Sequence, residues 1–520
     1  GPPGGTPVPR WRLLRSVLAA ALCVAPWPVA GATAEKVKAV LDAYEANVDA
    51  QNEQIMIMRV AEIEAILELP EERTPALHAL EEKALVESRA AWRRRAEKAL
   101  KDASISDKQL LQGASVDPEP EDLPDVQPAW KDGLRKVLTA EEFQHLEDRR
   151  LERKARRTRN LAELFLLFVD EKLALSADQR ARMLPLAEKL VPKVQEMMPA
   201  EVEQDEDLFN PAILLSAGKE APEKEVRAIL VDTQWERWKK TCVEPANGGG
   251  QEFNGIPGLM PPGFQAPPAN SAAANATEPV DQTLSKFMAA QALRQRQRLL
   301  APLLLQIEEA ARVAQLSPEV CARLQIGARG AAEKSLQKWA PQFQQFVRNN
   351  LQEITPENVS QQLARLGNPA AFQVAEAGPP KPGLFEKCLK TELTPEQMAA
   401  WQKEIDARRE FRSEAIIRAM LTGFDRLVPL RAEQFAKMSA MLTTLLADYR
   451  EEMGIANATE LAPWYLQSEI RSAPLAGLNP AEMQALLGKT RWERWTKTEE
   501  YSDAKSCWAN LKESHQNRRR

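Results

Sequence analysis

The sequence has few of the residues on which most enzyme sites depend. Its 520 residues include only 3 histidines, 5 cysteines and 22 glycines, and aromatic residues make up 6%. The histidines lack zinc-ligand spacing, no CxxC pair occurs and no glycine-rich loop suits a phosphate, which argues against metal and nucleotide enzymes. Neither sign of charge dominates, because 69 basic residues stand against 74 acidic ones, a net charge of −5. We therefore expect no metal, no cofactor and no nucleic-acid partner.

The N-terminal residues also lack acidic side chains. Arg10, Arg12 and Arg15 precede an apolar run at residues 17–25, and small residues of the A-x-A type follow. This order is typical of a secretory signal peptide, and the run is too short to cross about 30 Å of hydrocarbon. The sequence predicts a signal peptide over 1–34, cleaved after Ala32 or Ala34, and a periplasmic or secreted protein with no integral membrane span after cleavage.

What the sequence does contain is an internal repeat. Five short segments recur in the same order, at offsets that drift from 247 to 257 residues. Leu138-Thr-Ala-Glu-Glu matches Leu393-Thr-Pro-Glu-Gln, for example, and the tetrapeptide Trp-Glu-Arg-Trp occurs twice. A tandem duplication with small insertions in loops gives this pattern. The predicted organisation is helical unit 1 at 35–243, a linker rich in proline, glycine and asparagine at 244–280, helical unit 2 at 281–503, and a polar basic tail at 504–520.

The repeated segments have the form of helix starts. Thr139 and Thr394 each precede acidic or glutamine residues, so that a hydroxyl and the side chain three positions later can satisfy the first backbone amides. Apolar residues between the starts have helical period, and no strand-like alternation stands out. The fold class is therefore predicted as all-α, built from long antiparallel helices. The expected helices are 35–68, 71–102, 106–113, 139–173, 176–200 and 222–241, then 281–315, 318–349, 355–366, 394–427, 431–453 and 480–500.

The paired tryptophans are the sharpest local feature. In each Trp-Glu-Arg-Trp segment the two indoles project from one helix face, where they would stack on sugars or hold an apolar peptide. The alternative, which we favour, is that they anchor the last helix of each unit in its core. The residues concerned are Trp235, Trp238, Trp492 and Trp495, together with Trp92 and Trp339, which also recur at the same place in both units.

Two charged runs and four cysteines complete the search for chemistry. The basic run 149–159 is interpreted as the solvated face of a long helix, with glutamates three or four positions away as partners. The acidic run 201–207 is interpreted as a solvated loop, because it lacks the spacing of a calcium loop. Removal of the signal peptide leaves Cys242, Cys321, Cys388 and Cys507, whose irregular spacing predicts no disulfide framework.

The helix starts Leu138-Thr-Ala-Glu-Glu, Leu175-Ser-Ala-Asp-Gln and Leu393-Thr-Pro-Glu-Gln resemble the LTxxQ motif of the Spy/CpxP group of bacterial periplasmic helical proteins. The resemblance covers only these pentapeptides. It implies an envelope location and, by analogy with the cradle-shaped dimers of that family, shielding of unfolded clients or sensing of envelope stress.

The leading hypothesis is an exported, non-enzymatic helical-repeat protein of the bacterial envelope with a binding or structural role. Its partner would be a protein, a peptide or another envelope component. The alternative is a Spy-like periplasmic holdase or stress sensor, and a third candidate is an enzyme with an unrecognised carboxylate pair. The oligomeric state and the packing of the two units stay open at this point.

Overall fold

The computed structural model describes residues 34–67, 69–102, 117–197, 210–243, 280–351, 383–450 and 468–519, with 355, 358–359, 362–363 and 452–453. Within these ranges the fold is all-α, as predicted, and contains no strand. The signal peptide, the body of the linker, the expected helix 106–113 and the acidic run 201–207 lie outside the described residues.

The described residues of the first half form four long helices and several short ones. They are α2 (Ala34–Leu67), α3 (Thr74–Asp102), α5 (Pro128–Val137), α6 (Ala140–Leu173), α7 (Ala177–Met197), α9 (Pro211–Ser216), α10 (Glu223–Arg227) and α11 (Asp232–Trp238). The second half consists of α12 (Val280–Val313), α13 (Pro318–Asn350), α15 (Leu384–Glu392), α16 (Pro395–Leu427), α17 (Ala432–Asp448), α18 (Ser468–Gly477), α19 (Pro480–Leu487), α20 (Lys489–Thr496) and α21 (Glu499–Arg519).

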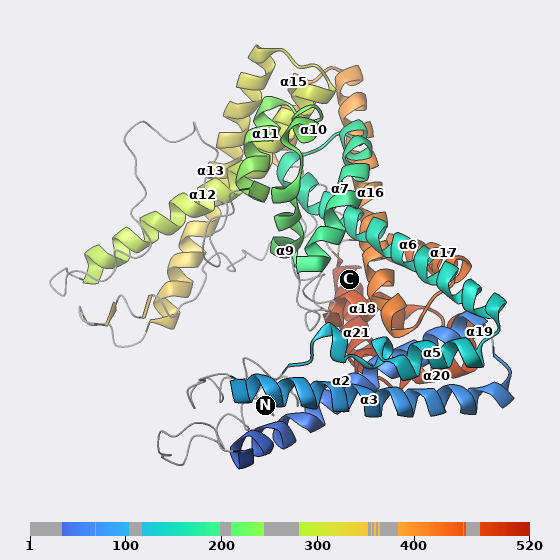
Figure 1. Cartoon of the computed structure of the whole chain (residues 1–520). Helices are drawn as coiled ribbons and strands as arrows, with labels where there is room; N and C mark the ends of the chain where they lie inside the picture. Colours follow the sequence, from blue (N-terminus) through green and yellow to red (C-terminus); the bar gives the residue numbers. More distant parts are fainter. Residues whose placement is uncertain are drawn as a thin grey trace.

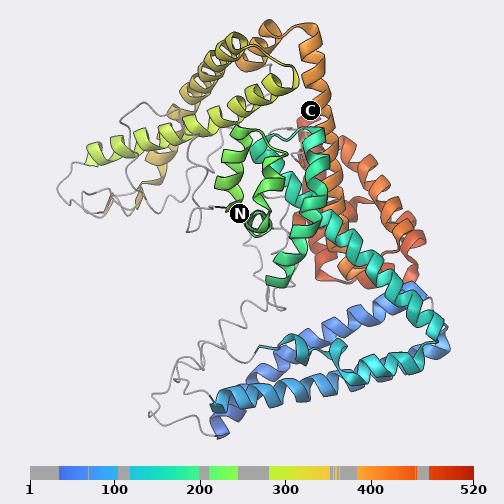
Figure 2. The same cartoon turned by 45° about the horizontal axis from the view of Figure 1, so that its top comes forward.

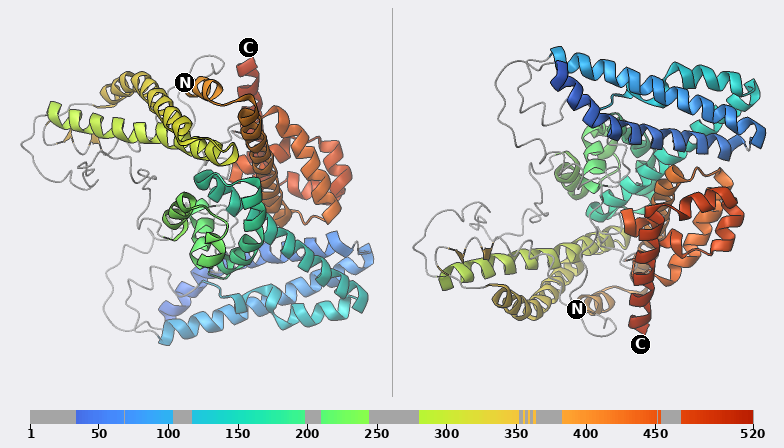
Figure 3. Two further views of the ribbon diagram at one scale, coloured as in Figure 1. Left: turned by 90° about the horizontal axis from the view of Figure 1, so that it is seen from above. Right: turned by 90° about the horizontal axis from the view of Figure 1, so that it is seen from below.

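These helices form one body and two arms (Figure 1). The body contains α6, α7 and α9 to α11 from the first half and α16 to α21 from the second. One arm is the pair α2/α3 and the other is the pair α12/α13, and each extends from the body toward the same side (Figure 2). Seen from above and below, the two arms flank the body (Figure 3). The short helix α5 packs on α3, and α15 packs on α13.

The order and bounds of the helices match between the two halves. The starts of α2 and α12 are 246 residues apart, those of α6 and α16, and of α7 and α17, are 255 apart, and those of α11 and α20 are 257 apart. The apolar clusters beside the arms match as well. Val60 and Ile307 occupy corresponding places at an offset of 247, as do Trp130 and Phe385 at an offset of 255. The duplication stays a prediction from the sequence, and this correspondence supports it.

The predicted helix caps form in both halves. The Thr139 hydroxyl accepts a hydrogen bond from the Glu142 amide, and the Glu142 carboxylate accepts one from the Thr139 amide. Thr394 and Gln397 make the same two contacts at the start of α16. The capping-box prediction is therefore confirmed for both long helices of the body.

The ends of the two units differ from the expected single helices. The predicted helix 480–500 is broken at Gly488, whose φ of +84° is accessible to glycine at little cost, so that α19 ends there and α20 begins. The segment 504–520, expected as a polar tail, belongs mainly to α21, which buries Ala504 and Trp508. A Cβ at Gly477 would lie 2.2 Å from the Trp508 ring, so α21 packs directly on the end of α18.

The cap of α6 predicts a pH dependence of stability. Hydrogen bonds from Arg73, and then from the Thr139 amide, lower the pKa of Glu142 from 4.5 to about 2. Because the folded-state pKa lies below the unfolded one, this carboxylate stabilises the fold above about pH 4.5, and the contribution disappears as the pH falls toward 2.

We expect Glu142→Gln to lower the midpoint of thermal unfolding at pH 7, with a difference from the parent chain that vanishes near pH 2. The exposed neighbour Glu141, changed to glutamine, is the control. A Glu142→Gln deficit that is the same at both pH values would contradict this assignment.

Candidate functional site

The main hydrophobic core is shared by the two halves of the chain. One continuous cluster joins residues 161–242 to residues 415–495, including the centres of α6 and α16. The arms carry smaller clusters of their own. The two predicted units therefore pack against each other and share a core, which answers the question that the sequence left open.

All six tryptophans named from the sequence are buried. Trp235, Trp238, Trp492 and Trp495 belong to the shared core, and even the most exposed of them, Trp492, is only 9% accessible. Trp238 stands edge-on to Phe165 of α6, and Trp495 stands edge-on to Phe424 of α16.

Trp92 and Trp339 are also buried, one in each arm. The structure therefore places the six indoles where they pack within the fold, and none presents an open face on which a sugar would stack.

The long helices α6 and α16 run in opposite directions where they meet. Contacts with rising numbers on α6 have falling numbers on α16. They are Arg153 with Asp425, Asn160 with Thr422, Glu163 with Arg418 and Asp170 with Arg408. Most of these contacts are ion pairs. The surface between the two halves is therefore charged along its length as well as apolar.

Two ionic triads lie at the ends of this contact. In the first, Arg153 binds Glu62 of α2 and, at 3.3 Å from its Nε, Asp425 of α16. In the second, Arg408 binds Glu309 of α12 and, at 3.0 Å from its Nε, Asp170 of α6. Each arginine thus joins the arm of its own half to the long helix of the other half.

The second triad is the more deeply buried. The side chains of Asp170, Glu309 and Arg408 are at most 1% exposed. Burial lowers the pKa of Arg408, but Asp170 and Glu309 outweigh it and bring the pKa above its ordinary value, so the guanidinium is held in its charged form. Burial raises the pKa of Glu309 and lowers that of the neighbouring Arg412. These groups form a compact charged network within the core.

A cation–aromatic contact lies beside each triad. The Arg156 guanidinium of α6 lies 4.8 Å from the centre of the Phe435 ring of α17, and it donates to the Leu430 carbonyl. On the other side, the Arg180 guanidinium of α7 lies 5.3 Å from the Phe411 ring of α16, and it donates to the Leu175 carbonyl. Such contacts add about 0.5–1 kcal/mol each at exposed sites and about 2 kcal/mol when they are shielded from water.

The basic run 149–159 is only in part the solvated face that the sequence suggested. Arg149 pairs with Glu152, as expected of a helix surface, and Arg150 pairs with Glu147 on its own helix but also with Glu62 of α2. Arg153 and Arg156 are instead less than 20% exposed and reach across to α16, because that helix packs on this side of α6. The run is thus a packing surface between the halves, which the sequence of one helix could not reveal.

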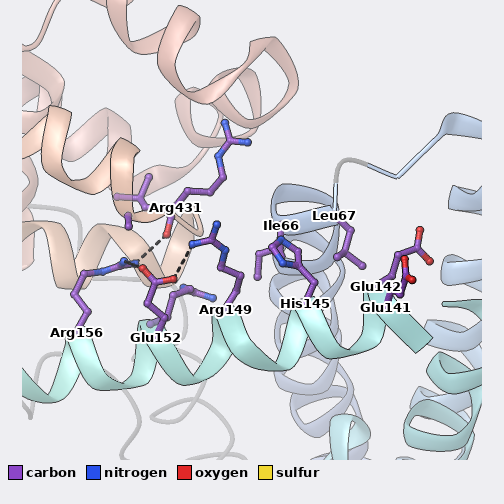
Figure 4. A pocket seen from close by; sticks show the side chains of 12 residues that line it. Ile66, Leu67, Glu141, Glu142, His145, Arg149, Glu152, Arg156 and Arg431 are labelled. Atoms are coloured by element: carbon purple, nitrogen blue, oxygen red, sulfur yellow. Dashed lines mark hydrogen bonds and ion pairs between the residues drawn. The ribbon is translucent and has the colours of Figure 1, made fainter. Parts of the chain in front are cut away.

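A cavity of about 400 Å³ opens beside the first triad, between α2, α6 and the start of α17 (Figure 4). Its wall carries four arginines, three glutamates and one histidine along with apolar side chains. The lining residues are Ile66, Leu67, Glu141, Glu142, His145, Arg149, Glu152, Arg153, Arg156, Leu430, Arg431 and Ala432. Two of the glutamates in the wall are paired, since Glu152 binds Arg149, also in the wall, and Glu142 binds Arg73, which lies outside it. The cavity therefore presents both signs of charge.

The described residues also answer two questions about reactive groups. No cluster of three or more histidine, cysteine, aspartate or glutamate side chains in them has the arrangement of a metal site. Burial raises the pKa of Cys242 to about 12, so this thiol stays protonated at neutral pH and is a poor nucleophile.

No helix in the described ranges combines the length and the apolar character needed to cross a membrane.

Comparison with known proteins gives no match: neither a family model, nor a curated protein, nor a solved structure is significantly similar to the chain. The similarity to the Spy/CpxP group thus rests on the helix-start motifs alone. In the structure these motifs cap helices, and their last residue also ties helices together. Gln179 donates to the Ile229 carbonyl ahead of α11, and Gln434, the equivalent position 255 residues later in Leu430-Arg-Ala-Glu-Gln, donates to the Leu486 carbonyl ahead of α20.

The depth of the two triads predicts an order of stability losses. Asp170→Ala leaves Arg408 and Arg412 buried with less compensation, and we expect a loss of about 3–5 kcal/mol in the free energy of unfolding. Asp425→Ala should cost less, because Arg153 keeps Glu62 and lies closer to solvent.

Urea unfolding of the three variants measures this order, with Asp406→Ala as the control. Asp406 is exposed and its ion pair is with Arg409 on its own helix, so its loss should change the free energy by less than about 0.5 kcal/mol. Equal losses for Asp170→Ala and Asp406→Ala would show that the buried triad does not stabilise the fold.

Proposed function

We propose that this chain is an exported, non-enzymatic protein of the bacterial envelope, in which a rigid body presents two helical arms to a protein or peptide partner. The observation that carries the proposal is the pair of matched arms, α2/α3 and α12/α13, on the same side of one body. Helices of 34 and 33 residues are about 50 Å long. Arms of this length provide a contact surface suited to a polypeptide.

The way in which the arms are joined supports a binding role. Each arm is tied to the body by a glutamate, Glu62 or Glu309, that binds the arginine of a buried triad. In addition, Arg237 of α11 binds Glu308 of α12, and Arg494 of α20 binds Glu64 of α2, so each half also holds the arm of the other. These contacts fix the direction of the arms before any partner arrives, which reduces the entropy lost on binding.

A Spy-like holdase is the second candidate, since two arms on the same side resemble the cradle of that family. Its clients would be extended apolar segments, and some apolar side chains on the arms are exposed. Val86 of α3 is 64% exposed and Ile326 of α13 is 69% exposed.

The client-binding hypothesis predicts that the mature protein, in several-fold excess, suppresses the aggregation of a chemically denatured test protein, as followed by light scattering. Val86→Lys combined with Ile326→Lys should weaken the suppression. Leu151→Lys is the matched control, because Leu151 is equally exposed but lies on α6 of the body. An absence of suppression by the parent protein would remove the holdase candidate and leave the two-armed scaffold for a specific partner.

The export hypothesis predicts the mass of the mature chain. Expression in a Gram-negative host, with an initiator methionine added before Gly1, should yield a periplasmic protein that begins at Thr33 or Glu35. The variant Leu18→Arg places a charge in the apolar run and should leave an uncleaved protein in the cytoplasm. An uncleaved parent chain in the cytoplasm would contradict export.

A further inference from the structure

The contacts between the two halves obey the rule of a twofold axis. In an interface between two equal subunits, a contact between positions i and j occurs a second time with the positions exchanged. Arg153 and Arg408 are equivalent positions, 255 residues apart, and so are Asp170 and Asp425. The ion pair of Arg153 with Asp425 is therefore repeated, with exchanged roles, by that of Arg408 with Asp170.

The arms extend this relation. Glu62 and Glu309 are equivalent at the offset of 247 that applies to the arm helices, and each binds the arginine of its own half. The two triads are thus copies of one arrangement, built from three equivalent pairs of positions.

The cation–aromatic contacts obey the same rule with the residue types exchanged. Position 156 is equivalent to position 411, and position 180 is equivalent to position 435. In one contact Arg156 of unit 1 lies on Phe435 of unit 2, and in the equivalent contact Arg180 of unit 1 lies on Phe411 of unit 2. Unit 1 therefore supplies the arginine and unit 2 the phenylalanine in both contacts. The geometry is preserved although each position has changed its chemistry.

One contact lies on the axis itself. Glu163 and Arg418 are equivalent positions, again 255 residues apart, and they bind each other. A residue that meets its own equivalent must lie where the axis passes, and here the two copies carry opposite charges.

The residue differences between equivalent positions favour the pairing of unit 1 with unit 2 over the pairing of two identical units. Two copies of unit 1 placed in this way would oppose Glu163 to Glu163 and Arg156 to Arg180, and two copies of unit 2 would oppose Arg418 to Arg418. Repulsion and lost contacts penalise both, whereas unit 1 on unit 2 satisfies every position.

We propose that the contact between α6 and α16 is the isologous interface of a fused dimer, and that unit 1 of one chain can pair in the same way with unit 2 of a second copy. The product is a closed dimer of two chains that have exchanged units. Within one chain the units meet at an effective concentration near the millimolar range, so the monomer prevails in dilute solution. Weakening the contact in one chain while restoring it between chains should reverse that preference.

The test uses two full-length charge variants. Glu163→Arg and Arg418→Glu each place like charges on the axis of their own chain. When they are unfolded together and refolded, exchange brings the two substituted positions together as an ion pair of reversed polarity at one interface, and it restores the original pair at the other. We expect the mixture to contain at least about tenfold more dimer than either variant alone, measured by size-exclusion chromatography with light scattering, since such a charge pair contributes more than about 1.4 kcal/mol.

The double variant Glu163→Arg/Arg418→Glu is the control and should return to a monomer. The exposed neighbours Arg159 and Glu414 can turn away from the exchanged charges. If the double variant folds as a monomer but the mixture of the two single variants forms no dimer, exchange between chains is overturned. If the mixture forms no more dimer than each single variant alone, selection by the Glu163–Arg418 pair is overturned.

A second measurement avoids charge reversal in the core. The Asn160 amide lies 2.8 Å from the Thr422 hydroxyl across the interface. Chains carrying Asn160→Cys and chains carrying Thr422→Cys, refolded together at high concentration and oxidised, should give a peptide linked between positions 160 and 422, identified by mass spectrometry. Absence of that linked peptide, where the chain with both substitutions forms it internally, would also overturn the proposal.

Discussion

The arrangement of this protein depends on two arginines that lie between its long helices, Arg408 fully buried and Arg153 largely so. Moving a charged group from water into a protein interior costs several kcal/mol, and this cost is offset only where the partners are close and well placed. Arg153 and Arg408 are each held by two carboxylates, one from the same half and one from the other. A shift of one helix along the other would leave a buried guanidinium without its partner. The charged contacts therefore fix the register of the two halves, while the apolar core around them provides most of the stabilisation.

The same ion pairs also determine how the two arms are attached to the body. Because Glu62 and Glu309 complete the triads from α2 and α12, the register of the body and the positions of the arms are set by the same groups. Contacts from Arg237 and Arg494 to the arm of the opposite half add a second tie. A long helix pair attached at one end would otherwise be free to swing. The structure instead makes the direction of each arm a property of the interface.

The sequence predicted the features that depend on neighbouring residues. The starts of α6 and α16 fall within one residue of the predicted positions, because Thr139 and Thr394 form their caps with side chains three residues away. All-α architecture follows from the same local patterns. The segment 504–520 was missed because its composition is polar, and only the spacing of Ala504 and Trp508, one helical turn apart, marks a buried face.

The partners of the buried charges were not predicted, because they come from distant parts of the chain. Arg153 is surrounded in the sequence by other basic residues and glutamates, and nothing local distinguishes it from Arg149, which stays at the surface. The duplication contains a usable signal, however. At the offset of 255, Arg153 and Asp170 recur as Arg408 and Asp425, while most other charges of the basic run do not. The charges that join the halves are thus among those that persist in both copies, although the exposed Lys154 also persists, as Arg409.

Most of the charged residues that line the cavity, in contrast, differ between the two halves. Its triad arginine recurs in the other half, but His145, Arg149 and Arg431 correspond to Ala400, Glu404 and Ser176. The triad positions 153/408 and 170/425 cannot change in one copy alone without leaving a charge unpaired, whereas residues beside the triads are released from that restriction. In this chain Arg149 and Glu404 carry opposite charges at equivalent positions, and Arg149 lies on the wall of this cavity, which faces the base of the α2/α3 arm.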